Sequence, residues 1–157
     1  MLPAFSGHLP CSLKRAMPSL VMRNTHGWEG FNATCFLDPT DGNFSHIGHS
    51  FLTKMIEAAG GQSDHVFSAD QFNEMAPASK DLTYLRQASQ RVYEIMASID
   101  PDAKWVMQGW FLVTWAMCHE SPDPKSACAG FWWQEEEQRA YLSGVPKGKL
   151  LILDLDA

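Results

Sequence analysis

The sequence predicts an α/β fold made of repeated βα units, in a single domain over residues 1–157 with no second domain. Short apolar runs typical of strands alternate with longer segments in which apolar residues recur at helical spacing. The last run, 149–156, is almost continuously apolar, which is typical of a strand buried on both faces of a parallel sheet. Right-handed crossovers would place the carboxyl ends of such strands on one side of the sheet.

Each element follows from a local pattern. Strands are expected over 2–5, 65–69, 104–110 and 149–156, and helices over 11–17, 50–59, 82–99 and 134–143. Gly60 and Gly61 stop the second helix, and Asp100 with Pro101 closes the third. Segment 24–44 combines Gly, Asn, Asp and Thr with embedded aromatic residues, so we expect a functional loop there. A Pro- and Gly-containing insertion is expected over 120–130.

The bulk composition excludes several classes of protein. With 45% hydrophobic and 11% aromatic residues, the chain is expected to be globular. A net charge of −6 without any Lys/Arg run argues against a nucleic-acid or anionic-membrane partner, and favours a neutral or weakly charged ligand. No apolar stretch reaches the roughly 20 residues of a membrane span. Residues 1–8 lack the charged lead and apolar block of a signal peptide.

No metal or other cofactor is expected. The four cysteines show no CxxC spacing: they are Cys11, Cys35, Cys118 and Cys128. One disulfide stays open as an interpretation, with Cys118 and Cys128 the closest pair in sequence. His46 and His49 have an HxxH spacing, but no carboxylate set accompanies them.

Two N-x-[ST] sequons are compatible with passage through a secretory route. They begin at Asn32 and Asn43.

Polar and aromatic residues follow three consecutive predicted strands. The strand 65–69 leads into Asp70 and the pair Asn73-Glu74, the next strand ends in Gln108 and Trp110, and the last ends at Asp154. In a parallel sheet these groups converge on one rim, where barrel enzymes build their active sites. Carboxylates, amides and indoles together are typical of a sugar pocket. We therefore interpret Glu74 as a catalytic carboxylate that moves a proton while Asn73 holds a polar substrate group.

Each of these residues also has a structural interpretation. The Asn73-Glu74 pair could belong to an ordinary loop that starts a helix, and a tryptophan at a strand end is often core or interface filler. Asp70 and Asp154 could be helix N-caps or turn residues. His8 could face the pocket or cap the helix that follows it. These alternatives stay open at the level of the sequence.

Five blocks of the chain, taken in order, resemble the catalytic domain of the alpha-N-acetylglucosaminidase family, glycoside hydrolase family 89. They lie at 2–10, 27–32, 69–75, 108–110 and 145–155. Members of this family are lysosomal exo-glycosidases that remove terminal alpha-linked N-acetylglucosamine from heparan sulfate. The resemblance implies a partial (β/α)8 TIM-type barrel, with about strands three to six and their helices. It also implies a lysosomal or secretory-pathway location and a carbohydrate partner with terminal N-acetylglucosamine.

The resemblance assigns roles to individual residues. The acid/base glutamate of the family falls on Glu74, in the Asn-Glu-Met motif, and Asn73 is expected beside it against the sugar. The other implied substrate-binding residues are Trp28, Trp110, Asp154 and Leu155. The family uses a retaining double displacement, in which a second carboxylate attacks the anomeric carbon.

The chain departs from the family in one respect that matters for chemistry. The family's nucleophilic glutamate lies beyond the last strand of this sequence, and Glu135, Glu136 and Glu137 belong to a predicted helix face rather than a strand end. We therefore expect the chain to be a fragment of a catalytic barrel that is inactive by itself. The alternatives are a non-catalytic carbohydrate-binding module and a truncated product that does not fold stably.

Overall fold

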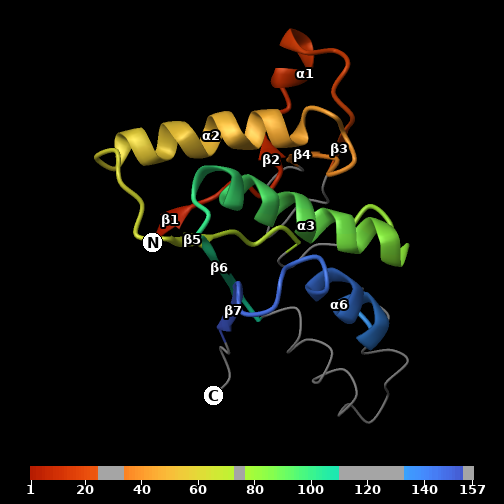
Figure 1. Ribbon diagram of the computed structural model, residues 1–157. Helices are drawn as coiled ribbons and strands as arrows, with labels where there is room; N and C mark the ends of the chain where they lie inside the picture. The colour runs from red at the N-terminus through yellow and green to blue at the C-terminus, as the bar shows by residue number, and fades with distance from the viewer. Residues whose placement is uncertain (25–33, 73–76, 110–132, 154–157) are drawn as a thin grey trace.

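A parallel sheet and a smaller antiparallel sheet form the framework of the molecule. The computed structural model describes residues 1–24, 34–72, 77–109 and 133–153. The parallel sheet has the strand order β1-β5-β6-β7 (Figure 1). Its strands are β1 (Leu2–Pro3), β5 (Val66–Ser68), β6 (Lys104–Gln108) and β7 (Leu150–Leu153). The antiparallel sheet has the order β2-β4-β3, with β2 (His8–Leu9), β4 (Cys35–Leu37) and β3 (Met22–Asn24).

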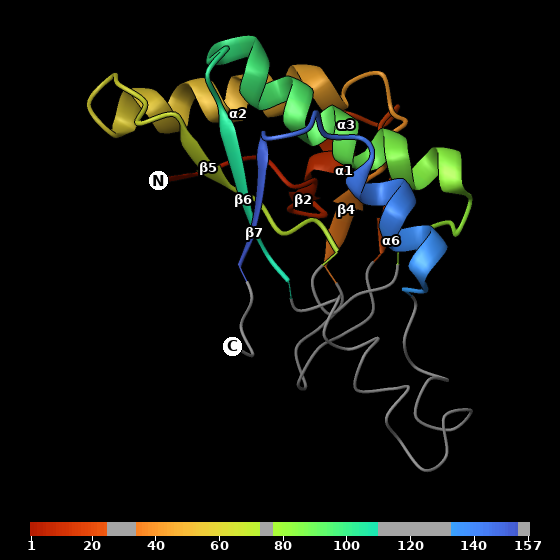
Figure 2. The same cartoon turned by 60° about the horizontal axis from the view of Figure 1, so that its bottom comes forward.

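Helices connect the parallel strands, as the α/β prediction requires. They are α2 (Phe44–Ala58), α3 (Leu82–Ile99) and α6 (Glu135–Leu142). The short helix α1 (Leu13–Ala16) instead lies between β2 and β3 of the antiparallel sheet. Helix α2 packs against α3, and α3 packs against α6. The three helices gather on one side of strands β5 to β7 (Figure 2). Each of α3 and α6 lies between two parallel neighbouring strands in the chain order, so the predicted βα units are confirmed. None of the helices in the described ranges has the length and hydropathy of a membrane span.

The predicted start of helix α2 is wrong. It begins at Phe44 rather than near Ser50, and its buried residues are Phe44, Gly48 and Leu52. The buried face thus passes through a glycine, which gives no apolar signal in the sequence. A Cβ atom on Gly48 would lie 2.3 Å from Ile95 Cδ1 and 2.8 Å from Phe5 Cδ1. The missing side chain is what lets α2 approach α3 and the residues after β1.

The segment 24–44 is not one loop in the described residues. It contains β4, whose three residues are all buried, and the first residue of α2. The register pairs Asn24 of β3 with Cys35 of β4. Strands of three residues are too short for an alternating pattern to stand out among Gly, Asn, Asp and Thr. The helix expected over 11–17 is likewise reduced to the four residues of α1.

The expectation that the last strand is buried on both faces is also wrong for this structure. In β7, Leu151, Ile152 and Leu153 are 55%, 39% and 46% exposed. Strand β7 pairs with β6 on one side and forms an edge of the sheet among the described strands. The apolar sequence reflects a strand suited to burial, but no described element covers it. Such an edge exposes both apolar side chains and unpaired backbone groups.

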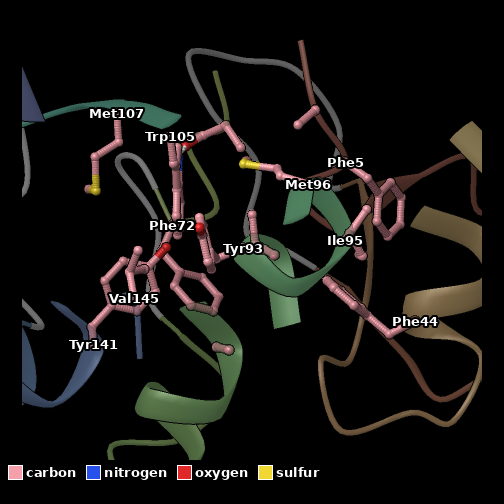
Figure 3. Packing of buried hydrophobic residues seen from close by; sticks show 14 of the residues in the cluster. Phe5, Phe44, Phe72, Tyr93, Ile95, Met96, Trp105, Met107, Tyr141 and Val145 are labelled. Carbon is pink, nitrogen blue, oxygen red and sulfur yellow. Dashed lines mark hydrogen bonds between the residues drawn. The ribbon is translucent and has the colours of Figure 1, made fainter. Parts of the chain in front are cut away.

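Aromatic side chains fill the core on the helix side of the sheet. Trp105 of β6 lies edge-on to Tyr141 of α6, with ring centres 6.2 Å apart, and Phe72 lies 5.9 Å from the same tyrosine (Figure 3). The Trp105 indole Nε1 donates a hydrogen bond of 2.8 Å to the carbonyl oxygen of Ala69. A second group joins Phe5 to Phe44 at 5.2 Å. These contacts attach the helices to the part of the sheet where the strands end.

Substituting Gly48 by alanine should destabilise the fold. An alanine in an unobstructed helix position is more stable than glycine by about 0.5–1 kcal/mol. At Gly48 the added carbon would meet Ile95 and Phe5 below van der Waals distance, and overpacking of this kind costs about 1–3 kcal/mol. We expect Gly48→Ala to lower the free energy of unfolding in urea. The control is Gly42→Ala, where a Cβ meets nothing within 4 Å. A gain of stability for Gly48→Ala would contradict the close helix packing.

A histidine and an aspartate join the amino ends of β5 and β6. The His65 Nδ1 lies 2.9 and 2.8 Å from the two carboxylate oxygens of Asp100. The hydrogen bond with Asp100 raises the pKa of His65, with added attraction from the charges of Asp100, Asp102 and Asp64. For Asp100, burial alone acts to raise the pKa, but the hydrogen bonds from His65 and Ser63 more than offset it and the pKa is lowered.

The sign of these pKa changes makes stability depend on pH. Because the pKa of His65 is raised on folding, its contribution is complete below about pH 6.5 and is lost as pH rises through the folded-state pKa. The contribution of Asp100 is lost only in strong acid, as pH falls through its lowered pKa. We therefore expect His65→Asn to reduce the stability advantage of pH 5.5 over pH 8.5 in urea unfolding. Asparagine tolerates the positive φ of 64° at this position. The control is His49→Asn on α2, and an unchanged pH dependence in His65→Asn would refute the assignment.

Candidate active site

The residues that follow β5 are fixed to β6 by a side chain. The Asp70 Oδ1 accepts a hydrogen bond of 2.9 Å from the backbone N–H of Gln108, the last residue of β6. This bond to another strand gives Asp70 a role beyond the helix N-cap or turn residue that the sequence left open. A carboxylate that bonds a neighbouring backbone N–H replaces the ladder bond that is lost where the strands separate. This bond keeps the ends of β5 and β6 at one level.

The ends of β6 and β7 are joined by the backbone itself. The Gly109 N–H donates a hydrogen bond of 2.8 Å to the carbonyl oxygen of Leu153. The register pairs Gln108 with Leu153. A Cβ atom on Gly109 would lie 2.9 Å from that same carbonyl oxygen, so the close approach requires glycine. The three carboxyl ends thus lie side by side at one rim of the sheet (Figure 2).

The predicted site residues lie outside the described ranges. They are Trp28, Asn73, Glu74, Trp110, Asp154 and Leu155. Five of these six residues follow the ends of β5, β6 and β7 within a few residues in the sequence, and those strand ends lie together in the structure. Phe72 precedes Asn73, Gly109 precedes Trp110, and Leu153 precedes Asp154 in the sequence. The convergence of the three strand ends is confirmed, whereas the positions of the side chains themselves remain predictions.

The antiparallel sheet contacts the same rim through an aromatic series. The ring of Phe36 on β4 lies 5.4 Å from that of Phe72 and 5.3 Å from that of His8. His8 belongs to β2, and the N-cap of α1 is Ser12. His8 therefore packs beside the residues that follow β5 instead of capping the next helix.

A disulfide joins Cys11 to Cys35, which the sequence did not single out. The cysteines are 24 residues apart. The link ties Cys11, which precedes the N-cap of α1, to the first residue of β4. Cys118 and Cys128, the closest pair in sequence, lie outside the described residues. Sequence distance gives no sign of the Cys11–Cys35 link, because the antiparallel sheet brings these two residues together.

A buried carboxylate holds the other end of β4. Asp38 is 1% exposed and accepts hydrogen bonds from Arg23 Nε at 2.6 Å and from the backbone N–H and Oγ1 of Thr40 at 2.9 and 2.7 Å. Burial acts to raise the pKa of Asp38, but the hydrogen bonds from Thr40 and Arg23 outweigh it and the pKa is lowered. The carboxylate is thus ionised and occupied by partners of its own sheet, which indicates a structural role.

Potential metal ligands gather at the opposite end of the sheet. Within the described ranges, His65, Asp100 and Asp102 offer ligand atoms that lie within 4.8 Å of one another. They flank the amino ends of β5 and β6, whereas the candidate site is at the carboxyl ends. The hydrogen bonds of Asp100 to His65 and to the backbone N–H of Asp102 account for this cluster.

Comparisons with known proteins support a glycoside hydrolase barrel. The whole chain, residues 1–157, matches the model of the family described as "Alpha-N-acetylglucosaminidase (NAGLU) tim-barrel domain". Human alpha-N-acetylglucosaminidase is 37% identical over 161 residues, which is 100% of this chain and 20% of that protein. The chain therefore spans about a fifth of the length of this relative.

Solved structures show the same fold. A family 89 glycoside hydrolase from Clostridium perfringens, in complex with 2-acetamido-1,2-dideoxynojirmycin, superposes with a TM-score of 0.73 at 22% identity. The match covers 99% of this chain and 15% of that one. A form of the Clostridium enzyme with two glutamates replaced by glutamine, in complex with its substrate GlcNAc-alpha-1,4-galactose, has a TM-score of 0.72 at 21% identity, with 99% and 15% covered.

Fold and rim together define part of an α/β barrel of the glycoside hydrolase class. The chain belongs to the alpha-N-acetylglucosaminidase family. The partial barrel expected from the sequence is thereby confirmed.

Removing the Asp70 carboxylate should loosen the rim locally. A hydrogen bond to a charged group is worth about 1.5–3 kcal/mol, so Asp70→Ala should speed hydrogen exchange of the Gln108 amide by roughly 10- to 100-fold. The measurement is amide exchange by nuclear magnetic resonance. The control is Asp81→Ala, since Asp81 accepts a hydrogen bond from the backbone N–H of Tyr84 and should affect that amide instead. Unchanged exchange at Gln108 would show that Asp70 does not hold the two strand ends.

Proposed function

We propose that this chain carries the acid/base half of the active site of a retaining exo-acting alpha-N-acetylglucosaminidase. The single observation that supports the proposal is that the carboxyl ends of β5, β6 and β7 lie side by side at one rim of the sheet. The Asp70–Gln108 and Gly109–Leu153 hydrogen bonds hold these ends together. In barrels the residues that follow the strands form the active site. Glu74 and Trp110 follow two of these ends within a few residues.

The proposed chemistry begins with proton transfer. Glu74 donates a proton to the glycosidic oxygen as the bond to the anomeric carbon breaks, and a second carboxylate attacks that carbon to give a glycosyl-enzyme. Glu74 then takes a proton from the water that releases the sugar. Asn73 and Asp154 bind polar groups of the sugar, and Trp28, Trp110 and Leu155 supply apolar surface for its ring.

The substrate in this proposal is a carbohydrate with a terminal alpha-linked N-acetylglucosamine. Human alpha-N-acetylglucosaminidase is named for this activity, and the Clostridium enzyme is described with GlcNAc-alpha-1,4-galactose as its substrate. Breakdown of heparan sulfate in the lysosome is the setting that the family resemblance suggests. The Cys11–Cys35 disulfide supports an oxidising compartment such as the secretory route.

The retaining mechanism needs two carboxyl groups about 5–5.5 Å apart. The three acidic residues of α6 are an unsuitable source for the second carboxylate. Glu135 pairs with Arg139 at 2.6 Å, Glu137 accepts the Gln134 N–H in a capping box, and Glu136 is exposed on the same helix. The second carboxylate is therefore proposed to come from the rest of the barrel. The isolated chain is expected to give no turnover of an alpha-N-acetylglucosaminide.

Glu74→Gln tests the proposal in a longer protein that completes the barrel. We expect kcat for GlcNAc-alpha-1,4-galactose to fall by about 10²- to 10⁴-fold, because the sugar leaving group requires protonation. A dinitrophenyl glycoside needs no such help, so its glycosylation step should be much less affected. Steady-state and burst kinetics with both substrates make this comparison.

The matched control is Glu136→Gln, at an exposed position on α6. It should leave both rates unchanged. Equal losses on the two substrates in Glu74→Gln would argue against a general-acid role. Saturable binding of N-acetylglucosamine without any hydrolysis by the longer protein would favour a carbohydrate-binding module.

A further inference from the structure

One buried amide at the rim has an unfilled hydrogen-bonding position. Gln71 is 1% exposed, and its Oε1 accepts a hydrogen bond of 3.2 Å from the hydroxyl of Tyr141. Its Nε2 has no hydrogen-bond partner in the structure described. If the amide is rotated by 180°, the nitrogen meets the tyrosine and the oxygen becomes the unpaired end. In either orientation one end of a buried amide is unpaired, which is rare in folded proteins.

A small cavity lies beside this amide. It has a volume of about 10 Å³, and its lining includes Asp70, Gln71, Gln108 and Tyr141. Such a volume is about the minimum that holds one water molecule, and it is far too small for a sugar ring. A buried water also needs two to four polar partners. Asp70 supplies acceptor oxygens, since its Oδ1 has one described partner, the N–H of Gln108, which also lines the cavity.

We propose that this cavity is a binding site for one water molecule, which accepts a hydrogen bond from Gln71 Nε2 and donates one to the Asp70 carboxylate. The site lies between the ends of β5 and β6. The Tyr141 hydroxyl donates to Gln71 Oε1, which leaves Gln71 Nε2 as the amide donor for the water. Burial, and then the nearby charge of Asp70, raise the pKa of Tyr141, so the hydroxyl stays protonated.

The water would give Gln71 a positioning role. Asp70 holds the Gln108 backbone, and the water would hold Asp70. The chain of contacts from Tyr141 through Gln71 and the water to Asp70 would connect helix α6 to the place where β5 and β6 separate. This inference does not depend on the proposed hydrolase activity, because it concerns only described residues.

Water-selective nuclear magnetic resonance on the whole chain tests the site directly. We expect the side-chain amide protons of Gln71 to show cross-relaxation to water of opposite sign in the laboratory and rotating frames, as a bound water of long residence gives. Gln90 is the internal control, because its side-chain amide is at an exposed position and donates to Glu94. Absence of a long-lived water at Gln71 in the folded protein would overturn the proposal without any substitution.

Two variants test the positioning role. Gln71→Met keeps a side chain of similar length without an amide, so we expect loss of the water signal and at least threefold faster hydrogen exchange at the Gln108 amide. Gln90→Met should change neither. Unchanged exchange at Gln108 in Gln71→Met would refute the positioning role. The same nuclear magnetic resonance measurement is then repeated with N-acetylglucosamine added. Replacement of the water signal by contacts between Gln71 and the sugar would overturn the assignment to water.

Discussion

The carboxyl ends of β5, β6 and β7 are held at the same level, and the candidate site depends on this constraint. Parallel strands diverge where their ladder ends, so something must replace the missing hydrogen bonds. Between β5 and β6 the replacement is the Asp70 carboxylate on the Gln108 N–H. Between β6 and β7 it is the Gly109 backbone, at a distance that only glycine permits. The residues proposed to bind the sugar follow these three ends in the sequence.

The aromatic core supports the rim from the helix side. Phe72 contacts Phe36 of the antiparallel sheet and Tyr141 of α6, so a single side chain connects three parts of the molecule. Trp105 bonds the Ala69 carbonyl oxygen, which fixes the backbone just before Asp70. By contrast, the edge at β7 carries exposed leucine and isoleucine side chains. The rim is therefore well supported at β5 and β6, whereas β7 has apolar surface suited to a further barrel strand.

The main sheet could be predicted because its signals are local. Strands β5 and β6 are apolar runs with clear ends. Helix α3 carries a regular apolar stripe, and Asp81 caps its amino end by accepting a hydrogen bond from the Tyr84 N–H. The start of α2 could not be predicted, because the buried Gly48 has no side chain to give a periodic signal. Strand β4 and the Cys11–Cys35 disulfide depend on contacts between distant segments, which no window of sequence contains.

Some features of the candidate site could likewise be predicted from the sequence, and others could not. The positions of Glu74 and Trp110 after two strand ends follow from chain order alone, and the structure confirms that these ends are neighbours. The roles of Asp70 and Gln71 could not be read from sequence, because each depends on a partner from another element, Gln108 in one case and Tyr141 in the other. A polar residue beside a catalytic motif is compatible with many roles until its partners are known.

Titration of the chain with N-acetylglucosamine, followed residue by residue through backbone amide chemical shifts, tests the central claim most directly. The account predicts saturable shift changes at Asp70 to Phe72, Gln108, Gly109 and Leu153, with little change at His65 and Lys104 at the other end of the same strands. Changes confined to the amino ends of the strands, or spread over the helices without any at the carboxyl ends, would contradict a saccharide site at this rim.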